Sequence, residues 1–462
     1  MVKERVLIEL EALQQRAFQA FSAALESRME AVDQVESMLE PLAGLDIDVD
    51  DALPPVPMFS APAEAPTETF ARLAAFASVE TNPDMPSSTT VVSAEVDRRS
   101  LEELRGRPGV VTVWPDSRLT LYADVPPSEE DSSVFDLANS QAGVDCRPFR
   151  PAATIRTIRR LLGVDTIWRD GFRGQNIVVG IIDEGVNGTV YPVVGGFSRP
   201  DARQPGSADI GSHGSMCAAD VLIAAPAAKL FDYPFLGEPR SGGALAMLNA
   251  VLEQRRRDGT PHLTNNSYGF TAVPPRDRFP NHEVWDPQHP LHRKVREVIS
   301  SGAPAFFAAG NCGTQCPSGN CHASGIGPAR SIHASNSLAE VVTIAAVNSR
   351  HERIGYSSQG PGMFEQRKPD LACYSHIFAN FGPGRPAGGA ASKFDNGTSA
   401  ATPVAAGVAA LLLSAIPDLA PNDLKAALIA GAVNIGPPGW DADHGHGVVN
   451  AAASYSLLKR RA

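Results

Sequence analysis

Uninterrupted apolar runs that end in small or polar residues characterise the long C-terminal part of the chain. Residues 177–182 are almost all β-branched and lead into Asp183, and residues 305–309 lead into Gly310 and Asn311. Such runs, without polar alternation, are typical of strands buried on both faces of a parallel sheet. The pattern therefore predicts a parallel sheet with polar side chains at the carboxyl ends of its strands, where α/β proteins bind ligands.

A longer apolar stretch, residues 404–413, has no polar position and predicts a buried helix. Ser399 lies just before it, in the segment Asn396–Pro403, among small residues that would let a substrate backbone approach its hydroxyl. A proline is tolerated in a first helical turn, so Ser399 would lie near the helix N-terminus. There, unpaired N–H groups and the helix dipole favour developing negative charge. The alternative is a helix start whose small residues serve packing alone.

Three further polar residues occupy similar strand-to-helix settings. Asp183 and Asn311 each follow an apolar run, and His213 lies among small residues before a helix-like stretch. A serine becomes a nucleophile when a base takes its proton, and histidine titrates near neutral pH. An amide side chain can donate to an oxyanion. Each residue alone also has a structural explanation, but together with Ser399 they predict an acyl-transfer site.

The N-terminal part of the chain shows a different pattern. Residues 1–45 are charged and helix-favouring, and their apolar positions recur at helical spacing, which predicts one or two amphipathic helices. That apolar stripe consists of Leu7, Leu10, Ala17, Phe18, Phe21 and Leu25. Through residues 1–42 it would pack on its own chain, self-associate or bind a protein partner. Residues 46–88 are acidic and proline-rich and predict a linker around a short helix near 67–78, and residues 123–154 predict a second linker.

Residues 89–122 predict a small α+β domain between these linkers. Strand-like runs at 90–96 and 110–114 flank a capping box at Ser100–Glu103 that opens a short helix. The tail that follows has no glycine or proline over residues 117–122, so it can be extended.

In chain order, the motifs around Asp183, His213, Asn311 and Ser399 resemble those of the subtilisin-like serine proteases, the subtilase or peptidase S8 family. The resemblance implies an α/β fold, a parallel sheet with helices on both faces, which we expect over residues 155–462. It also implies a role for each residue. Asp183 would orient the imidazole of His213, the general base. Ser399 would be the nucleophile, and Asn311 would donate to the oxyanion.

The same resemblance implies where substrate binds. One segment, residues 266–269, would pair with the substrate backbone and form a wall of the pocket for the side chain that precedes the scissile bond. The strand end before Asn311 is also expected to bind substrate. The expected substrate-binding residues are Ser267, Tyr268, Gly269, Ala308, Ala309 and Gly310.

Residues 89–122 resemble the later half of the inhibitory propeptide found in many subtilases. Their tail would add as a strand beside the first of these segments, since main-chain hydrogen bonds give such pairings affinity. It would deliver Leu121 or Tyr122 to the pocket, and cleavage would fall near the Tyr122–Ala123 bond. An unrelated α+β domain is one alternative, and an uncut domain displaced by a partner that binds residues 1–42 is another.

Three of the six cysteines directly follow Asn311, namely Cys312, Cys316 and Cys321. Their spacing does not match the paired cysteines of common zinc sites. A disulfide within this loop, a metal site and reduced thiols are the alternatives, and no metal site is assigned. Cys217 and Cys373 are expected to be buried small residues, and Cys146 lies in the expected second linker.

Composition narrows the classes of partner and location. The chain has 462 residues, of which 43% are hydrophobic, and a formal net charge of −11. The acidic balance argues against a nucleic-acid partner, which calls for a basic patch. No apolar run reaches the roughly 18 residues of a membrane span, so no transmembrane segment is expected. The first residues lack the apolar core of a signal peptide, so the expected location is cytoplasmic, with export without a cleavable leader as the alternative.

The expected activity is that of a serine endopeptidase, which hydrolyses a polypeptide substrate through an acyl-enzyme and is autoinhibited by its N-terminal region. No cofactor is required, although calcium is possible. Peptide ligation or macrocyclisation on the same fold is an alternative, in which an amine replaces water. Another is a partner-activated regulatory protease whose main role is binding. A silent binding scaffold is disfavoured, because Ser399, His213 and Asn311 are all present.

Overall fold

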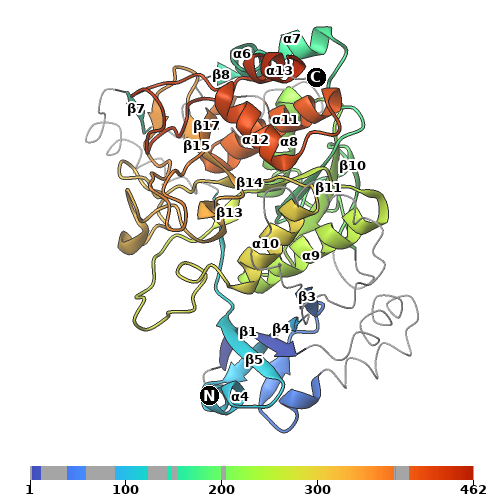
Figure 1. The fold of residues 1–462 in the computed structure, drawn as a ribbon, viewed down its shortest axis with the longest axis vertical. Coiled ribbons are helices and arrows are strands. Elements are labelled where there is room, and N and C mark those ends of the chain that lie inside the picture. The colour runs from blue at the N-terminus through green and yellow to red at the C-terminus, as the bar shows by residue number, and fades with distance from the viewer. Residues whose placement is uncertain are drawn as a thin grey trace.

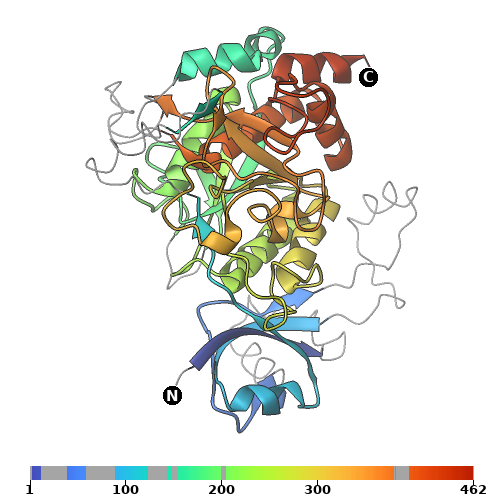
Figure 2. The ribbon, with the colours of Figure 1, turned by 90° about the vertical axis from the view of Figure 1, so that its left-hand side faces the viewer.

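The described residues form two parts that contact each other, a small N-terminal sheet and a larger α/β domain. The small sheet lies at the lower end of the molecule in both ribbon views (Figures 1 and 2). The computed structural model describes residues 3–11, 39–58, 89–122, 143–146, 153–198, 204–378, 380 and 395–460.

The N-terminal sheet is five-stranded and antiparallel, in the order β2-β4-β1-β5, with β3 also paired to β4. Its elements are β1 (Lys3–Glu11), a 3-10 turn (Glu40–Leu42), β2 (Ile47–Val49), β3 (Val56–Met58), β4 (Thr89–Asp97), α4 (Ser100–Arg105) and β5 (Val110–Pro115). The strand, helix and strand expected between residues 89 and 115 are thus present as β4, α4 and β5.

Because β1 is a strand, the prediction of a helix over residues 1–45 is wrong there. β1 lies between β4 and β5, and both its faces are covered. Ile8 and Leu10 belong to the core beneath α4, whereas Leu7 packs toward the larger domain. A strand covered on both faces lacks regular alternation, and its long-range pairing outweighs helix propensity. Residues 12–38 lie outside the described residues.

The two predicted linkers are also partly wrong. Within residues 46–88, β2 and β3 are edge strands that pair with β4. Within residues 123–154, two short strands, β7 (Val144–Asp145) and β8 (Ala153–Thr154), join the larger domain. Strands this short carry too few residues to show a hydrophobic period. The short helix expected in the first linker lies outside the described residues, as do residues 123–142 and 147–152.

The larger domain is built on a nine-stranded sheet in the order β10-β11-β9-β12-β14-β15-β16-β7, with β17 also paired to β15. All pairings are parallel except that of β15 with β16. Its strands are β9 (Val178–Asp183), β10 (Val193–Gly196), β11 (Lys229–Pro234), β12 (Leu263–Asn266), β14 (Ala305–Ala308), β15 (Val342–Val347), β16 (Arg353–Ile354) and β17 (Leu371–Tyr374). Two pairs lie outside it, β13 (Tyr268–Gly269) with β6 (Thr120–Leu121), and β18 (Ile377–Phe378) with β8.

Helices cover both faces of this sheet, as the resemblance implied (Figures 1 and 2). On one face, α8 and α11 pack together in a core shared with α6, α7, α12 and α13. On the other face, α9 and α10 share a core with the inner face of the N-terminal sheet. The helices are α6 (Ile155–Leu162), α7 (Val164–Arg169), α8 (His213–Ala224), α9 (Ser241–Asp258), α10 (Pro290–Ser300), α11 (Gly397–Ala415), α12 (Pro421–Ala430) and α13 (Ala451–Lys459), with 3-10 turns at Ala323–Gly325 and Ala334–Ser337.

Helix α11 is the apolar helix predicted from residues 404–413, and it runs through the centre of the domain. Among the described residues it is the one helix that is long and apolar enough to cross a membrane by length and composition. The domain buries 89% of that apolar window. The core helix of a globular domain has the same length and composition, so this feature is weak evidence for a membrane span.

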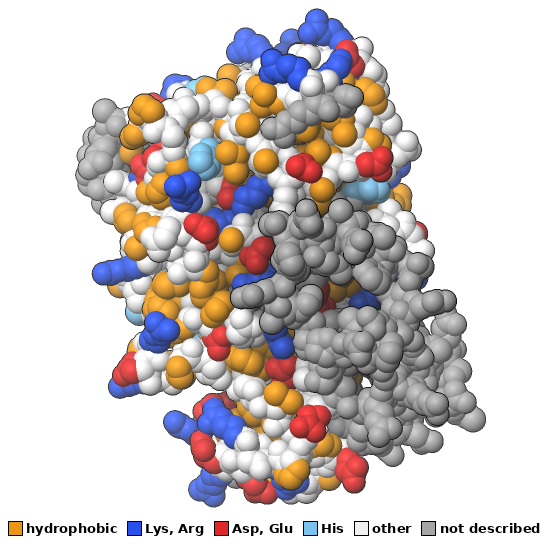
Figure 3. Space-filling model, viewed as in Figure 1, with side chains coloured by type: hydrophobic (Ala, Val, Ile, Leu, Met, Phe, Trp, Pro, Cys, Tyr) orange, Lys and Arg blue, Asp and Glu red, His pale blue; other side chains and the backbone are white. Residues whose placement is uncertain are grey.

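Charge is mixed on the face drawn in Figure 3, where acidic and basic side chains are interspersed over the described residues. Basic side chains gather at the upper end, over α6 and α13 (Figures 1 and 3). Arg156 and Arg160 on α6 and Lys459 on α13 are exposed there. This basic end is opposite the N-terminal sheet.

Candidate active site

Asp183 and His213 form a buried hydrogen-bonded pair. Asp183 is the last residue of β9, which lies between β11 and β12, and His213 is the first residue of α8. The Nδ1 atom of His213 lies 2.8 Å from one carboxylate oxygen of Asp183 and 2.9 Å from the other. An ionised carboxylate only accepts, so Nδ1 carries the proton and Nε2 is left as the basic nitrogen. Nε2 has no hydrogen-bond partner among the described residues.

The surroundings of His213 favour its protonated form. Burial lowers the pKa of the imidazole, but the charge of Asp183 and its hydrogen bond raise it, and the charge of Glu184 adds to this. The net result is a pKa above the ordinary value. The Glu184 carboxylate also accepts from the backbone N–H of His213, at the N-terminus of α8.

Ser399 lies in the first turn of α11, as the apolar pattern predicted, and it is fully buried. Its hydroxyl donates to the backbone oxygen of Tyr122 at 2.8 Å. Asn311, which follows β14, donates from Nδ2 to the same oxygen at 2.8 Å. Its other side-chain atom, Oδ1, accepts from the backbone N–H and the hydroxyl of Thr398, each at 2.9 Å. Because Thr398 holds Oδ1, the amide nitrogen of Asn311 is aimed at the carbonyl of Tyr122.

The tail of the N-terminal part enters this site as an extended strand. β6 pairs antiparallel with β13, with Leu121 opposite Tyr268, and the N–H of Tyr122 donates to Ser267 O at 3.1 Å. On its other edge, Leu119 donates to Pro239 O at 2.8 Å. The pairing beside residues 267–269 that the sequence predicted is therefore present.

The Tyr122 side chain fills a closed pocket and is only 2% exposed. Its hydroxyl donates to Phe270 O at 3.2 Å, and burial raises the pKa of the phenol. A Cβ added to Gly269 would lie 2.1 Å from the Tyr122 hydroxyl, and one added to Gly310 would lie 3.3 Å from the ring. Both walls therefore leave room for the ring because they carry no side chain.

The other expected substrate-binding residues divide into two groups. Ser267 and Tyr268 contact the tail through their backbone, as described. By contrast, Ala308 and Ala309 support the sheet, since Ala308 O accepts from Asn336 and Ala309 N–H donates to Ile344 O. Asn336 also donates to Tyr268 O at 2.8 Å and so holds the segment that pairs with the tail. No sequence pattern points to Asn336, because it lies in a 3-10 turn outside any recognisable motif.

The six cysteines form two disulfides and two buried thiols. Cys312 is bonded to Cys321 within the loop after Asn311, which is the disulfide alternative raised by the sequence. Cys316 is bonded to Cys146, which the sequence placed in a linker and did not pair. Cys217 and Cys373 are free and buried, as expected.

Asp183, His213 and Cys217 are the one group of metal-binding side chains close enough to share an ion among the described residues. Burial is the main cause that raises the pKa of the Cys217 thiol, followed by the nearby charge of Asp183. A thiol must lose its proton to bind a metal ion. A protonated Cys217 is a poor metal ligand, so these three side chains are better explained by the hydrogen bond between Asp183 and His213 than by a metal site.

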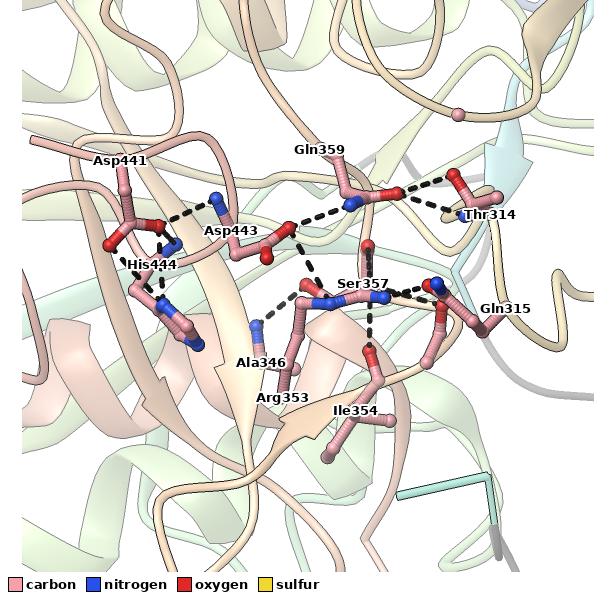
Figure 4. Close-up of polar contacts among 12 residues, drawn as sticks. Thr314, Gln315, Ala346, Arg353, Ile354, Ser357, Gln359, Asp441, Asp443 and His444 are labelled. Atoms are coloured by element: carbon pink, nitrogen blue, oxygen red, sulfur yellow. Dashed lines mark hydrogen bonds and ion pairs between the residues drawn. The ribbon is translucent and has the colours of Figure 1, made fainter. Parts of the chain in front are cut away.

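Arg353 contacts the loop after Asn311 through Gln315 (Figure 4). Its side chain is 4% exposed and donates to Ser357 O at 3.2 Å and to the amide oxygen of Gln315 in that loop. It also forms an ion pair with Asp443, whose Oδ1 accepts from Gln359 at 2.6 Å. Burial lowers the pKa of the guanidinium below its ordinary value. The charge is nevertheless well satisfied, so the loop, β16 and the C-terminal segment are held together.

The disulfide between Cys146 and Cys316 leads to a testable expectation about stability. It closes a sequence separation of 170 residues, and disulfides that close long loops stabilise by typically 2–4 kcal/mol. We expect Cys146→Ser combined with Cys316→Ser to lower Tm by several degrees, measured by calorimetry. In the native chain, alkylation without reductant should modify none of the four bonded cysteines. Six thiols that react without reductant would contradict both disulfides.

Comparison with known proteins agrees with this geometry. The subtilase family model matches residues 174–447. Over 306 residues the chain is 29% identical to subtilisin DY of Bacillus licheniformis, which covers 64% of this chain and 96% of that protein. It is 27% identical over 362 residues to the serine protease AprX of Bacillus subtilis, covering 67% of this chain and 75% of AprX.

Solved structures agree on the fold. The crystal structure of fervidolysin from Fervidobacterium pennivorans, a keratinolytic enzyme related to subtilisin, superposes with a TM-score of 0.57 at 17% identity. That match covers 98% of this chain and 61% of fervidolysin. The family model alone spans more than half of the chain, and the structure places the motif residues at the carboxyl edge of the expected parallel sheet. The chain therefore belongs to the subtilase family and is a subtilisin-like serine protease.

Proposed function

We propose that the chain is an endopeptidase in which Asp183, His213 and Ser399 act as a catalytic triad and Asn311 completes the oxyanion hole. One observation carries the proposal. The backbone oxygen of Tyr122 lies 2.8 Å from both Ser399 Oγ and Asn311 Nδ2, so a peptide carbonyl already lies beside the attacking hydroxyl and an oxyanion donor.

The proposed mechanism follows from these positions. His213 Nε2 takes the proton of Ser399, whose oxygen attacks the peptide carbonyl, and Asp183 stabilises the imidazolium that forms. Asn311 Nδ2 and the Ser399 N–H donate to the oxyanion. The imidazolium then protonates the leaving amine. In the second half of the reaction, His213 takes a proton from water, which attacks the acyl-enzyme, and returns a proton to Ser399 as the acyl group leaves. Every proton passes through His213, first from Ser399 to the leaving amine and then from water back to Ser399, so we propose that catalysis requires no cofactor.

We further propose that the N-terminal region inhibits the enzyme in cis. Its tail occupies the site as a substrate would, and three polar contacts fix the region at its base. Asp116 Oδ1 accepts from Gly242 N–H at the start of α9 at 2.8 Å. Ser117 Oγ donates to Glu283 at 2.8 Å, and Glu9 accepts from Arg293 at 2.6 Å. Before cleavage the tether keeps this segment at high effective concentration. After cleavage at Tyr122–Ala123 the strand pairing, the Tyr122 contacts and these three polar contacts remain, so the fragment would still inhibit.

We expect a separately produced fragment of residues 1–122 to abolish peptide hydrolysis when it is added at micromolar concentration to the processed enzyme. The reason is that the fragment presents Tyr122 to its pocket together with the strand pairing beside Tyr268. Initial rates on a peptide substrate measure the inhibition. The matched control is the same fragment carrying Tyr122→Asp, which places a charge in the closed pocket and should inhibit at least tenfold less well. Undiminished hydrolysis with the native fragment would contradict the inhibitory role.

A further inference from the structure

A second chain of buried polar groups, separate from the pair of Asp183 and His213, ends at the helix that carries Ser399. The backbone N–H of Gly397 donates to the hydroxyl of Tyr356 at 2.7 Å. That hydroxyl lies 3.0 Å from Nε2 of His376, and Nδ1 of His376 lies 3.4 Å from Oδ2 of Asp145. The three side chains are each at most 2% exposed.

The chemistry of these groups determines which partner donates in each of these hydrogen bonds. The Asp145 carboxylate accepts, so Nδ1 of His376 donates to it and Nε2 accepts from Tyr356. The Tyr356 oxygen in turn accepts from Gly397 N–H. Within this series of hydrogen bonds, His376 and Tyr356 each donate one bond and accept another, an arrangement in which neighbouring hydrogen bonds strengthen one another.

The position of Gly397 controls both groups that contact the carbonyl of Tyr122. Its φ is +78°, and an added Cβ would lie 2.5 Å from Tyr122 O and 3.0 Å from Asn311 Nδ2. The next residue, Thr398, holds Oδ1 of Asn311, and Ser399 follows. A shift of Gly397 would therefore move the hydroxyl and the oxyanion donor together.

The far end of this series of hydrogen bonds lies in β7, within the residues predicted as the second linker. β7 pairs parallel with β16, and Asn348 Nδ2 donates to Asp145 at 2.9 Å. The adjacent residue, Cys146, is bonded to Cys316 in the loop after Asn311. Asp145 thus connects this short strand, through His376 and Tyr356, to α11, which carries Ser399. Cys146 connects it to the loop after Asn311.

His376 adopts a backbone conformation that fits such a role. Its φ is +58°, a left-handed value that residues other than glycine seldom adopt. Such conformations persist where the surroundings fix them, and they cluster at functional sites. Here the strained residue joins Asp145 to Tyr356.

We propose that Asp145, His376 and Tyr356 are positioning residues, which hold the N-terminus of α11 so that Ser399 and Asn311 face the substrate carbonyl together. The inference rests on the proposed function of Ser399 and Asn311. It also makes residues 143–146 part of the catalytic machinery, so an active processed enzyme must retain them.

Tyr356→Phe tests the proposal because it removes only the hydroxyl. We expect kcat for a peptide substrate to fall about tenfold or more while KM stays within about twofold, since misplaced reacting groups lower kcat. Active sites are counted with a fluorophosphonate in the processed enzyme, freed of residues 1–122, so kcat refers to labelled enzyme. His376→Gln should show the same split between kcat and KM.

Tyr374→Phe is the matched control. Tyr374 is also buried, and its hydroxyl is hydrogen-bonded to Nε2 of His351 at 2.9 Å. That hydroxyl has no hydrogen bond to Gly397 among the described residues. We expect it to lower Tm comparably while kcat stays within about twofold. Wild-type kcat in Tyr356→Phe, or an equal loss in Tyr374→Phe, would overturn the proposal. If Tyr356→Phe does not melt cooperatively, the kcat and KM of His376→Gln test the proposal instead, and native kcat in that variant would overturn it.

Amide hydrogen exchange supplies a readout independent of activity. Tyr356→Phe should speed exchange in the peptide that contains Gly397 and Ser399, and Tyr374→Phe should not. Unchanged exchange in Tyr356→Phe overturns the positioning role even if the native chain proves inactive. A processed enzyme that is inactive, with faster exchange in Tyr356→Phe, would instead support the contact and contradict the proposed function.

Discussion

Ser399→Ala is expected to lower kcat for peptide hydrolysis by about 10⁶-fold, the loss found when the nucleophile is removed from a subtilisin. The reason is geometric. The Ser399 hydroxyl is the group that meets the carbonyl of Tyr122, and alanine has nothing to deliver to a carbonyl carbon. The same change should leave the Tyr122–Ala123 bond uncut. Single-turnover kinetics of the enzyme without residues 1–122 measure the first effect, and mass spectrometry of the full-length chain measures the second.

Ser414→Ala is the matched control for this change, because Ser414 lies near the far end of the same helix and does not contact Tyr122. Its hydroxyl donates to Leu411 O at 2.7 Å and accepts from Gly174 N–H at 3.1 Å. It should keep its activity and its labelling by a fluorophosphonate, whereas Ser399→Ala should lose both and still melt cooperatively. Product mass also separates hydrolysis from transfer to an amine, since only hydrolysis adds water. Peptide hydrolysis by Ser399→Ala at the native rate would refute the assignment of the nucleophile.

Asn311→Ala is expected to lower kcat by about 10²–10³-fold, or about 2.7–4 kcal/mol, with little change in KM. Its Nδ2 atom is aimed at the carbonyl oxygen where charge develops, so the contact strengthens in the transition state. Steady-state kinetics on a peptide substrate measure kcat and KM and show whether kcat alone has fallen.

Two further variants identify the cause of that loss. Asn311→Asp keeps an oxygen for Thr398 but lacks the donor, so a loss at least as large as in Asn311→Ala points to oxyanion stabilisation rather than to loop packing. Asn320→Ala removes an exposed amide from the same loop and should be silent. Native kcat in Asn311→Ala would exclude its role at the oxyanion.

The parts of the site that the sequence predicted share one property: neighbouring residues in the chain are enough to reveal each of them. Asp183 and Asn311 end apolar strands, and Ser399 opens an apolar helix, so a run and its terminal residue reveal each position. The extended tail before Tyr122 is also visible locally, as a stretch without glycine or proline. Parallel strands bring their carboxyl ends to one edge, which joins these residues in space.

The errors arose where a residue's partner is distant in sequence. β1 was predicted as a helix because its Leu and Glu residues favour one, but its strand state comes from pairing with β4 and β5 on both sides. β7 is too short to show a hydrophobic period, and its place is set by β16. The partner of Cys316 could not be predicted, because Cys146 is 170 residues away in the chain.

By itself, the sequence determined the fold class, the order of the four motif residues and the tail that enters the site, because short runs and single side chains encode them. Only the tertiary structure decided which carbonyl meets Ser399, how Thr398 aims Asn311, and that Asp145 reaches Gly397 through His376 and Tyr356. Hydrogen bonds depend on distances of a few ångströms between atoms from separate strands and helices. Those distances exist only after the sheet and its covering helices have packed.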